Sequence, residues 1–298
     1  MNTRNLANAL SISSGSPAAR HLFAAFTGAS IFALSILSAS PAKADDCLLD
    51  TNNDGDTDAT TDTDGAADSS GANTRLACGV SATASGAFGT ALGNLTQASG
   101  SNGVAIGYAA TATAANTTTV GTSADATGAD ATAIGADAQA TGTGTVALGM
   151  NSSSSQAGGV AIGQNATAIG PSTTNTLFSS IAVGFNTTAQ DNAVAVGNTA
   201  IARFGGTATP STSGFNAAVA MGAGAVAVGS NTIAIGSTSR AGTGFTLNSP
   251  SSEVSAGSNI TVVGGRAEAN QNDATALGAA AEAAASGGTA VGGNAIIG

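Results

Sequence analysis

Short apolar stretches alternate with glycine along most of this chain. Between Gly103 and Gly107, Val104 and Ile106 alternate with Ala105. This pattern is typical of an extended segment, because successive side chains of a strand point to opposite faces. Five residues cannot bury an apolar face alone, so we expect such segments to stack on one another and to bury the face that carries valine and isoleucine.

The glycines that follow these stretches recur every 14 residues, and a second set lies midway between them. A unit of 14 residues allows two short strands and two tight turns, since glycine adopts positive φ at little steric cost. We therefore predict an all-β solenoid. A heptad coiled coil is excluded, because each glycine would cost about 1 kcal/mol in a helix. The first set is Gly79, Gly93, Gly107, Gly121, Gly135, Gly149 and Gly163, and the second is Gly86, Gly100, Gly128 and Gly142, with Ala114 and Gln156 as exceptions.

The 14-residue repeats are predicted over residues 77–298, with three interruptions. Irregular stretches near 171–180, 202–215 and 239–253 carry the unusual residues, and the period resumes after each one. We interpret them as insertions that leave the stack as loops.

Apolar atoms lie on both faces of the predicted strands. Ala195, Ala220 and Ala234 occupy the face opposite to valine and isoleucine, so a second surface remains to be buried. This pattern predicts self-association, which cyclic symmetry would close.

The N-terminus is predicted to be a signal peptide over residues 1–44. Arg4 and Arg20 precede an apolar run from Leu22 to Ala39, and a small-x-small cleavage site ends at Ala44. The apolar run is long, so an uncleaved membrane anchor is the alternative. Either way the chain is expected to be exported.

The exported part is strongly acidic. Residues 45–298 contain four arginines and all 17 acidic residues, so the net charge is 4 − 17 = −13. Binding to nucleic acid needs lysine and arginine to displace counterions, so we exclude it.

The acidic segment 45–76 is a candidate calcium site closed by a disulfide. Aspartates and an asparagine alternate around glycine, as in the first half of an EF-hand loop, although Thr61 stands where that loop needs glutamate. Two cysteines in an exported chain favour a Cys47–Cys78 bridge. A solvated acidic linker and two free thiols are the alternatives. The predicted calcium ligands are Asp50, Asn52, Asp54, Asp56, Asp58, Asp62, Asp64 and Asp68.

The repeated A-[IV]-G phrases, as in AIGADAQATGTGTVALG from Ala133 to Gly149, resemble the YadA-like head repeats of trimeric autotransporter adhesins. The resemblance covers roughly residues 77–298. It implies a left-handed parallel β-roll and a side-by-side homotrimer. It also implies a place on the surface or outer membrane of a Gram-negative bacterium, where the head would bind host matrix or an abiotic surface. The chain ends inside a repeat, so we expect a fragment, a truncated reading frame, or a secreted head without its anchor.

One phrase is similar to the N-S-V-A-I-G-x-x-S motif of collagen-binding heads in that family. The resemblance implies a collagen-like ligand there, although the same residues are also what the roll itself needs. The candidate ligand-binding residues are Asn231, Thr232, Ile233, Ser237 and Ser239.

Catalysis is not expected, and neither is a small-molecule substrate. The one histidine, His21, lies in the predicted signal peptide. A non-adhesive structural solenoid or an ice-binding solenoid is the alternative function, and the latter would need regular ranks of threonine. Threonines do cluster at Thr117–Thr119, Thr141, Thr143 and Thr145, over a few coils.

Overall fold

The computed structural model describes residues 65–69, 74–170, 179–203, 217–246 and 254–298. The chain divides into two units, 1–44 and 45–298, and every described residue belongs to the second. The predicted signal peptide, Cys47 and all predicted calcium ligands except Asp68 therefore lie outside the described residues. The described residues form strands and turns, and none of their segments is a helix able to span a membrane.

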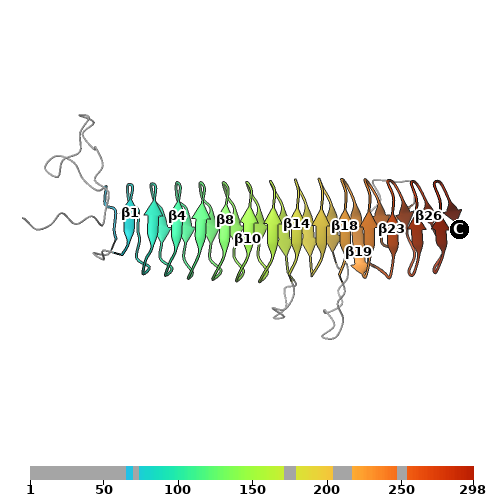
Figure 1. Ribbon diagram of the computed structural model, residues 1–298, viewed down its shortest axis with the longest axis horizontal. Helices are drawn as coiled ribbons and strands as arrows, with labels where there is room; N and C mark the ends of the chain where they lie inside the picture. Colours follow the sequence, from blue (N-terminus) through green and yellow to red (C-terminus); the bar gives the residue numbers. More distant parts are fainter. Residues whose placement is uncertain (1–64, 70–73, 171–178, 204–216, 247–253) are drawn as a thin grey trace, which may run out of the picture. The chain divides into compact units, whose positions relative to one another are not determined.

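The described strands form two parallel sheets, each of 14 strands, and the chain alternates between them (Figure 1). In both sheets the strands follow one another in chain order. The first sheet contains β1 (Leu76–Cys78), β2 (Thr90–Leu92), β4 (Val104–Ile106), β6 (Thr118–Val120), β8 (Thr132–Ile134), β10 (Val146–Leu148), β12 (Val160–Ile162), β14 (Ile181–Val183), β16 (Val194–Val196), β18 (Val219–Met221), β20 (Ile233–Ile235), β23 (Thr261–Val263), β25 (Thr275–Leu277) and β27 (Thr289–Val291).

The second sheet is built from shorter strands, and β22 pairs with β19 beside its main path. It contains β3 (Gln97–Ala98), β5 (Thr111–Ala112), β7 (Asp125–Ala126), β9 (Gln139–Ala140), β11 (Ser153–Ser154), β13 (Thr167–Ile169), β15 (Thr188–Gln190), β17 (Ile201–Arg203), β19 (Val226–Ser230), β21 (Arg240–Ala241), β22 (Gly257–Ser258), β24 (Glu268–Ala269), β26 (Glu282–Ala283) and β28 (Ile296–Ile297).

Neighbouring strands pair residues that are one repeat apart. Ala133 of β8 pairs with Ala147 of β10, and Ala147 pairs with Ala161 of β12, in steps of 14 residues. After the first insertion, Ala161 pairs with Ala182, so the register resumes. The predicted all-β solenoid with parallel strands and 14-residue coils is confirmed.

The interior is filled by alanine, and here the sequence-based expectation was wrong. We expected the valine and isoleucine face to be buried, but Ala105 is buried while Val104 and Ile106 are only half-buried. The two sheets of one narrow coil approach closely, so the middle residue of the first-sheet strands is alanine, except for Thr119 of β6 and Val262 of β23. The surface that points outward is therefore the valine and isoleucine face.

Two kinds of glycine allow the coils to stack this closely. Gly135 has φ of 135°, a conformation that residues with a Cβ rarely adopt. Gly128, midway between two such glycines, has no positive φ, but a Cβ there would collide with the carbonyl of Gly142 in the next coil. The glycine period thus reflects close backbone approach at both turns and positive φ at one.

The three insertions leave the stack at the same turn, which connects a second-sheet strand to the next first-sheet strand. They follow β13, β17 and β21, so they occur on every second coil. Residues Arg240–Ala241 of β21 remain in the stack, within the range 239–253. At the other end, stacking already includes residues 65–69, because the Asp68 amide donates to the Ala82 carbonyl at 2.8 Å.

Candidate interaction surfaces

The first sheet presents a continuous apolar surface to the outside. The middle residue of each of its strands points inward, so the first and third residues point outward. These outward positions are valine, isoleucine, leucine, methionine or threonine from β2 to β27, and we call this surface the apolar face. Ile134, Leu148 and Met221 are among its most exposed members. Apolar surfaces of this extent usually mark an interface.

The second sheet is polar on its outer side over the first coils. Six hydroxyl residues lie one per coil just beyond the second-sheet strands, and none of these hydroxyls hydrogen-bonds to another described residue. The backbone ladder holds them in register, since the Thr113 amide donates to Ala126 and the Thr127 amide to Ala140, at 3.2 and 3.1 Å. We call this row the hydroxyl rank; it comprises Ser85, Ser99, Thr113, Thr127, Thr141 and Ser155.

The hydroxyl rank shares only Thr141 with the threonine cluster that was noted in the sequence. Thr117, Thr119 and Thr145 are buried inside the coils. Their hydroxyls donate to the backbone carbonyls of Ala114, Thr111 and Gly142, respectively. Of the six threonines in that cluster, Thr141 and Thr143 are exposed, and Thr118 is half-buried.

One turn of the solenoid carries ladders of asparagine. The side-chain amide of Asn102 donates to Asn116, and that of Asn116 donates to Asp130, both at 2.8 Å. A second ladder joins Asn231, Asn259 and Asp273 at 3.2 and 2.9 Å. All of these residues have φ between 52° and 59°, where asparagine and aspartate are favoured among residues with a Cβ.

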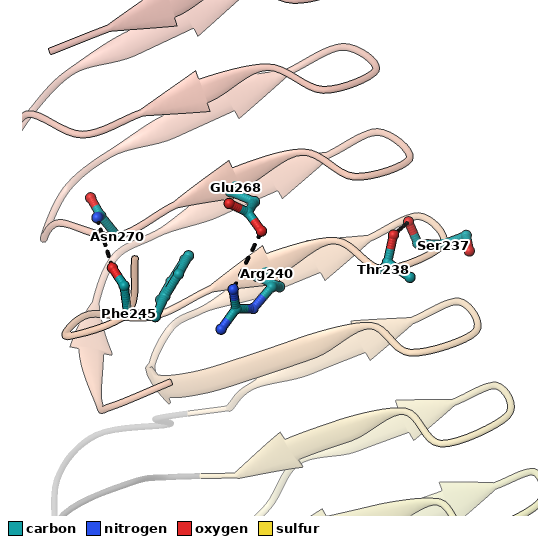
Figure 2. Close-up of polar contacts among 6 residues, drawn as sticks. All are labelled: Ser237, Thr238, Arg240, Phe245, Glu268 and Asn270. Carbon is teal, nitrogen blue, oxygen red and sulfur yellow. Dashed lines mark hydrogen bonds and ion pairs between the residues drawn. The ribbon is translucent and has the colours of Figure 1, made fainter. Parts of the chain in front are cut away.

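The described residues of the third insertion lie against the second sheet around a buried ion pair (Figure 2). The Arg240 guanidinium lies 3.4 Å from a Glu268 carboxylate oxygen on the next coil. The Phe245 ring covers Arg240, with the guanidinium carbon 4.1 Å from its centroid, and the Asn270 side chain donates to the Phe245 carbonyl. Phe245 also packs with Val228 and Val254.

Sequence reasoning missed this cluster. Its signal is a pair of opposite charges at equivalent strand positions, two full repeats apart in the sequence, in a chain with few charges. The insertion places those two repeats on adjacent coils, as the pairing of β21 with β24 shows.

Comparison with protein families finds five matches to the YadA head domain repeat, a family model that contains two copies of the repeat. The matched residues are 76–96, 98–124, 126–152, 216–239 and 261–281. The matched stretches follow the coils described above. The chain therefore contains YadA head domain repeats, and the matched stretches cover 120 of its 298 residues. No match to a curated protein was found.

YadA head domains are a non-enzymatic adhesin family, so the expectation that this chain is not an enzyme is confirmed. The family implies a trimeric autotransporter adhesin head and a bacterial protein exposed at the cell surface.

The candidate ligand-binding residues of the YadA head repeats lie at several places on one coil. Asn231 and Ser237 are exposed at opposite turns, and Ile233 is half-buried on the apolar face between them. Thr232 and Ser239 are buried, and their hydroxyls donate to the carbonyls of Gly229 and Gly236. The structure therefore brings Asn231, Ile233 and Ser237 to the surface of the coil but does not gather the five residues around one point.

The turn within this phrase, at Ser237 and Thr238, is visible in Figure 2. The Thr238 hydroxyl donates to the Ser237 carbonyl at 2.7 Å, and the Ser237 hydroxyl donates to the Ala223 carbonyl of the preceding coil at 3.4 Å. Both side chains are exposed.

The predicted metal and disulfide residues are only partly described. The Asp68 side chain is exposed, and no group of three potential metal-binding side chains occurs within the described ranges. Cys78 is disulfide-bonded. Its predicted partner, Cys47, lies outside the described residues, so the pairing of these two cysteines stays a prediction.

Two aspartates of the solenoid are only partly solvated. Burial raises the pKa of Asp125, on the outer side of β7, and that of Asp191, in the turn before β16. In each carboxyl group, Oδ1 is buried without a hydrogen-bond partner among the described residues.

Proposed function

We propose that this chain is the head of an exported, trimeric bacterial adhesin, and that its three copies associate through the apolar face. The observation that carries the proposal is the half-exposed row of valine, isoleucine and leucine along the whole first sheet. The matched YadA head repeats support the same assembly. Cyclic symmetry would bury this face in every copy and leave the second sheet and the turns in contact with the environment.

Substitution of one residue on each sheet tests the assembly. Ile134→Glu places a charge on the apolar face, while Gln139→Glu places one on the outer side of the second sheet in the same coil. We expect sedimentation of the full chain to give a trimer for the wild type and for Gln139→Glu, and smaller species for Ile134→Glu. A monomeric wild-type chain would contradict the proposal.

The proposed partner is a host matrix protein of collagen type, or an abiotic surface. Ser237 is exposed within the phrase similar to collagen-binding heads, and Asn198 occupies the equivalent turn position two coils earlier. We expect Ser237→Ala to weaken binding to an immobilised collagen triple helix, and Asn198→Ala to leave it unchanged. Equal binding by both variants would show that Ser237 is not part of the ligand site.

We also propose that the acidic segment 45–76 binds calcium through its aspartates. Clustered carboxylates are suitable ligands for this hard cation. Calorimetric titration of the full chain with calcium should release heat, and Asp54→Asn with Asp56→Asn should reduce it, while Asp273→Asn should not. If millimolar calcium releases no heat, the proposal that this segment binds calcium is wrong.

Ice binding is the second candidate function, and the hydroxyl rank favours it. Six coils in succession offer a hydroxyl at the spacing between parallel strands, about 4.8 Å. Thermal hysteresis of the full chain is the direct measurement. If the rank binds ice, Thr127→Tyr abolishes the hysteresis and Thr122→Tyr, at an exposed turn, does not; a wild-type chain without hysteresis rejects this function.

A further inference from the structure

The first two coils expose several large apolar side chains beside Cys78. Val80, Leu92 and Leu95 keep 46%, 42% and 50% of their surface exposed. Cys78 pairs with Leu92 across β1 and β2, and the Leu95 amide donates to the Val80 carbonyl at 2.9 Å. These three residues therefore lie around Cys78 on two adjacent coils, and we call them the N-terminal patch. From the apolar face, the patch extends around the turn that follows the first-sheet strands, where Tyr108, Met150 and Phe185 are likewise exposed on later coils.

Cys78 determines what can reach this patch. It is disulfide-bonded, and the sequence contains one other cysteine, Cys47. A disulfide holds the two Cα atoms about 4.4–6.8 Å apart. Each further residue adds at most about 3.8 Å, so the predicted bridge to Cys47 would keep the Cα atoms of the two residues after it within roughly 14 Å of the Cα atom of Cys78.

The two residues that follow Cys47 are Leu48 and Leu49. Between residues 45 and 75 they are the only large apolar side chains; aspartate, threonine, asparagine and other small residues make up most of that segment. Asp45, Asp46 and Asp50 flank them. The predicted tether would therefore bring two leucines within reach of an exposed apolar patch, with charged residues on either side of them that favour water.

We propose that the segment Cys47–Leu49 is a disulfide-tethered cap whose two leucines dock on the N-terminal patch. Residues 65–69 are the only described ones that stack ahead of the coil that begins at β1, and terminal repeats of a solenoid need a polar outer surface. The cap supplies it by covering Val80, Leu92 and Leu95 and turning its aspartates to solvent. The inference goes beyond the proposed adhesion and does not rest on the trimer, although it assigns Leu92, at the N-terminal end of the apolar face, to the cap and not to a neighbouring copy.

Photo-crosslinking in the full, oxidised chain tests the contact directly. A benzophenone amino acid replaces Leu95, and mass spectrometry identifies the peptide that it captures. We expect a crosslink within the same chain to the peptide that contains Leu48 and Leu49. The same group in place of Phe185, which is exposed at the equivalent turn of a later coil, should not capture that peptide.

Two variants separate the leucines from the tether. Leu48→Ser with Leu49→Ser leaves both cysteines in place and should abolish the crosslink, as should Cys47→Ser with Cys78→Ser. Thr60→Ser with Thr61→Ser, a polar change in the same segment, should preserve it. The proposal is overturned if the Leu48→Ser, Leu49→Ser chain crosslinks as well as the wild type. It is also overturned if the wild-type crosslink joins Leu95 to a second copy, or if Leu95 captures nothing while Cys78 remains bridged.

Discussion

Ala147 and Leu148 are consecutive residues of β10, yet Ala147 is completely buried and 41% of the Leu148 surface is exposed. The larger apolar side chain points away from the interior because the coil has room only for a methyl group there. The stability of one chain therefore depends on residues too small to fill most protein cores, and the larger residues are available for association.

This arrangement predicts opposite outcomes for substitutions at the two positions. Ala147→Leu overpacks the coil and should lower the free energy of unfolding by at least about 1–3 kcal/mol. Leu148→Ala should change the stability of the isolated chain little, although it removes apolar surface from the proposed interface. Denaturant unfolding below the association concentration measures both. Equal destabilisation by the two substitutions would contradict the inside–outside assignment.

The same pair of residues shows what could be predicted from the sequence. The 14-residue period gave the solenoid, because glycine is required where coils approach closely, as at Gly128 and Gly135. Hydrophobicity alone did not predict which face of each strand points into the coil. Valine and isoleucine are usually preferred inside, and only the distance between the two sheets reverses that preference here.

Glycines at different turns should respond differently to substitution. Gly135 has φ of 135° and packs against the Gly149 backbone, whereas Gly144 has φ of 64° and open space around its Cβ position. Gly135→Ala should cost about 1–3 kcal/mol for the backbone strain alone. Gly144→Asn should be nearly neutral or slightly stabilising, because asparagine tolerates this conformation and restricts the unfolded chain more than glycine does.

Thermal unfolding of the two glycine variants beside the wild type gives the comparison. Asn102, Asn116 and Asp130 occupy the equivalent position in the three coils before Gly144, so the site has a natural precedent for the asparagine side chain. If Gly144→Asn destabilises the chain as much as Gly135→Ala, positive φ alone governs both turns and the close approach at Gly135 is unimportant.

The buried ion pair between Arg240 and Glu268 should show strong coupling. Arg240→Met leaves the Glu268 carboxylate buried without its 3.4 Å partner, and this should cost about 3–5 kcal/mol. Arg240→Met combined with Glu268→Met should recover most of the loss, since a well-packed apolar pair replaces both charges. Arg266→Met, at an exposed turn, should change stability by less than about 0.5 kcal/mol.

A double-mutant cycle in denaturant measures this coupling. Additive effects of the two single substitutions would show that Arg240 and Glu268 do not act as a pair. The cluster was not predictable from the sequence because its members are brought together by an insertion whose length, one full repeat, leaves the glycine period unchanged from Gly236 to Gly264.

Asp125 should make stability depend on pH in the direction opposite to a salt-bridged carboxylate. Burial raises its pKa in the folded chain above the ordinary value of 3.8. The folded state therefore binds more protons than the unfolded state just above pH 3.8, and the free energy of unfolding falls as pH rises through that window. Above the raised pKa the penalty for the buried charge is fully present, and below 3.8 it disappears.

Asp125→Asn removes the charge and keeps the shape of the side chain, so the variant should be more stable than the wild type at pH 7. This advantage should shrink as the pH falls through the raised pKa and vanish below about pH 3.8, where Asp125 is protonated in both states. Asp191→Asn should behave in the same way, because burial also raises the pKa of Asp191 and asparagine adopts its φ of 59° readily. Unfolding curves of the three chains between pH 3 and pH 8 provide the measurement. A stability difference that stays constant across this range would mean that the carboxylate charge is not the source of the cost, and that the environment of β7 solvates it as well as water does.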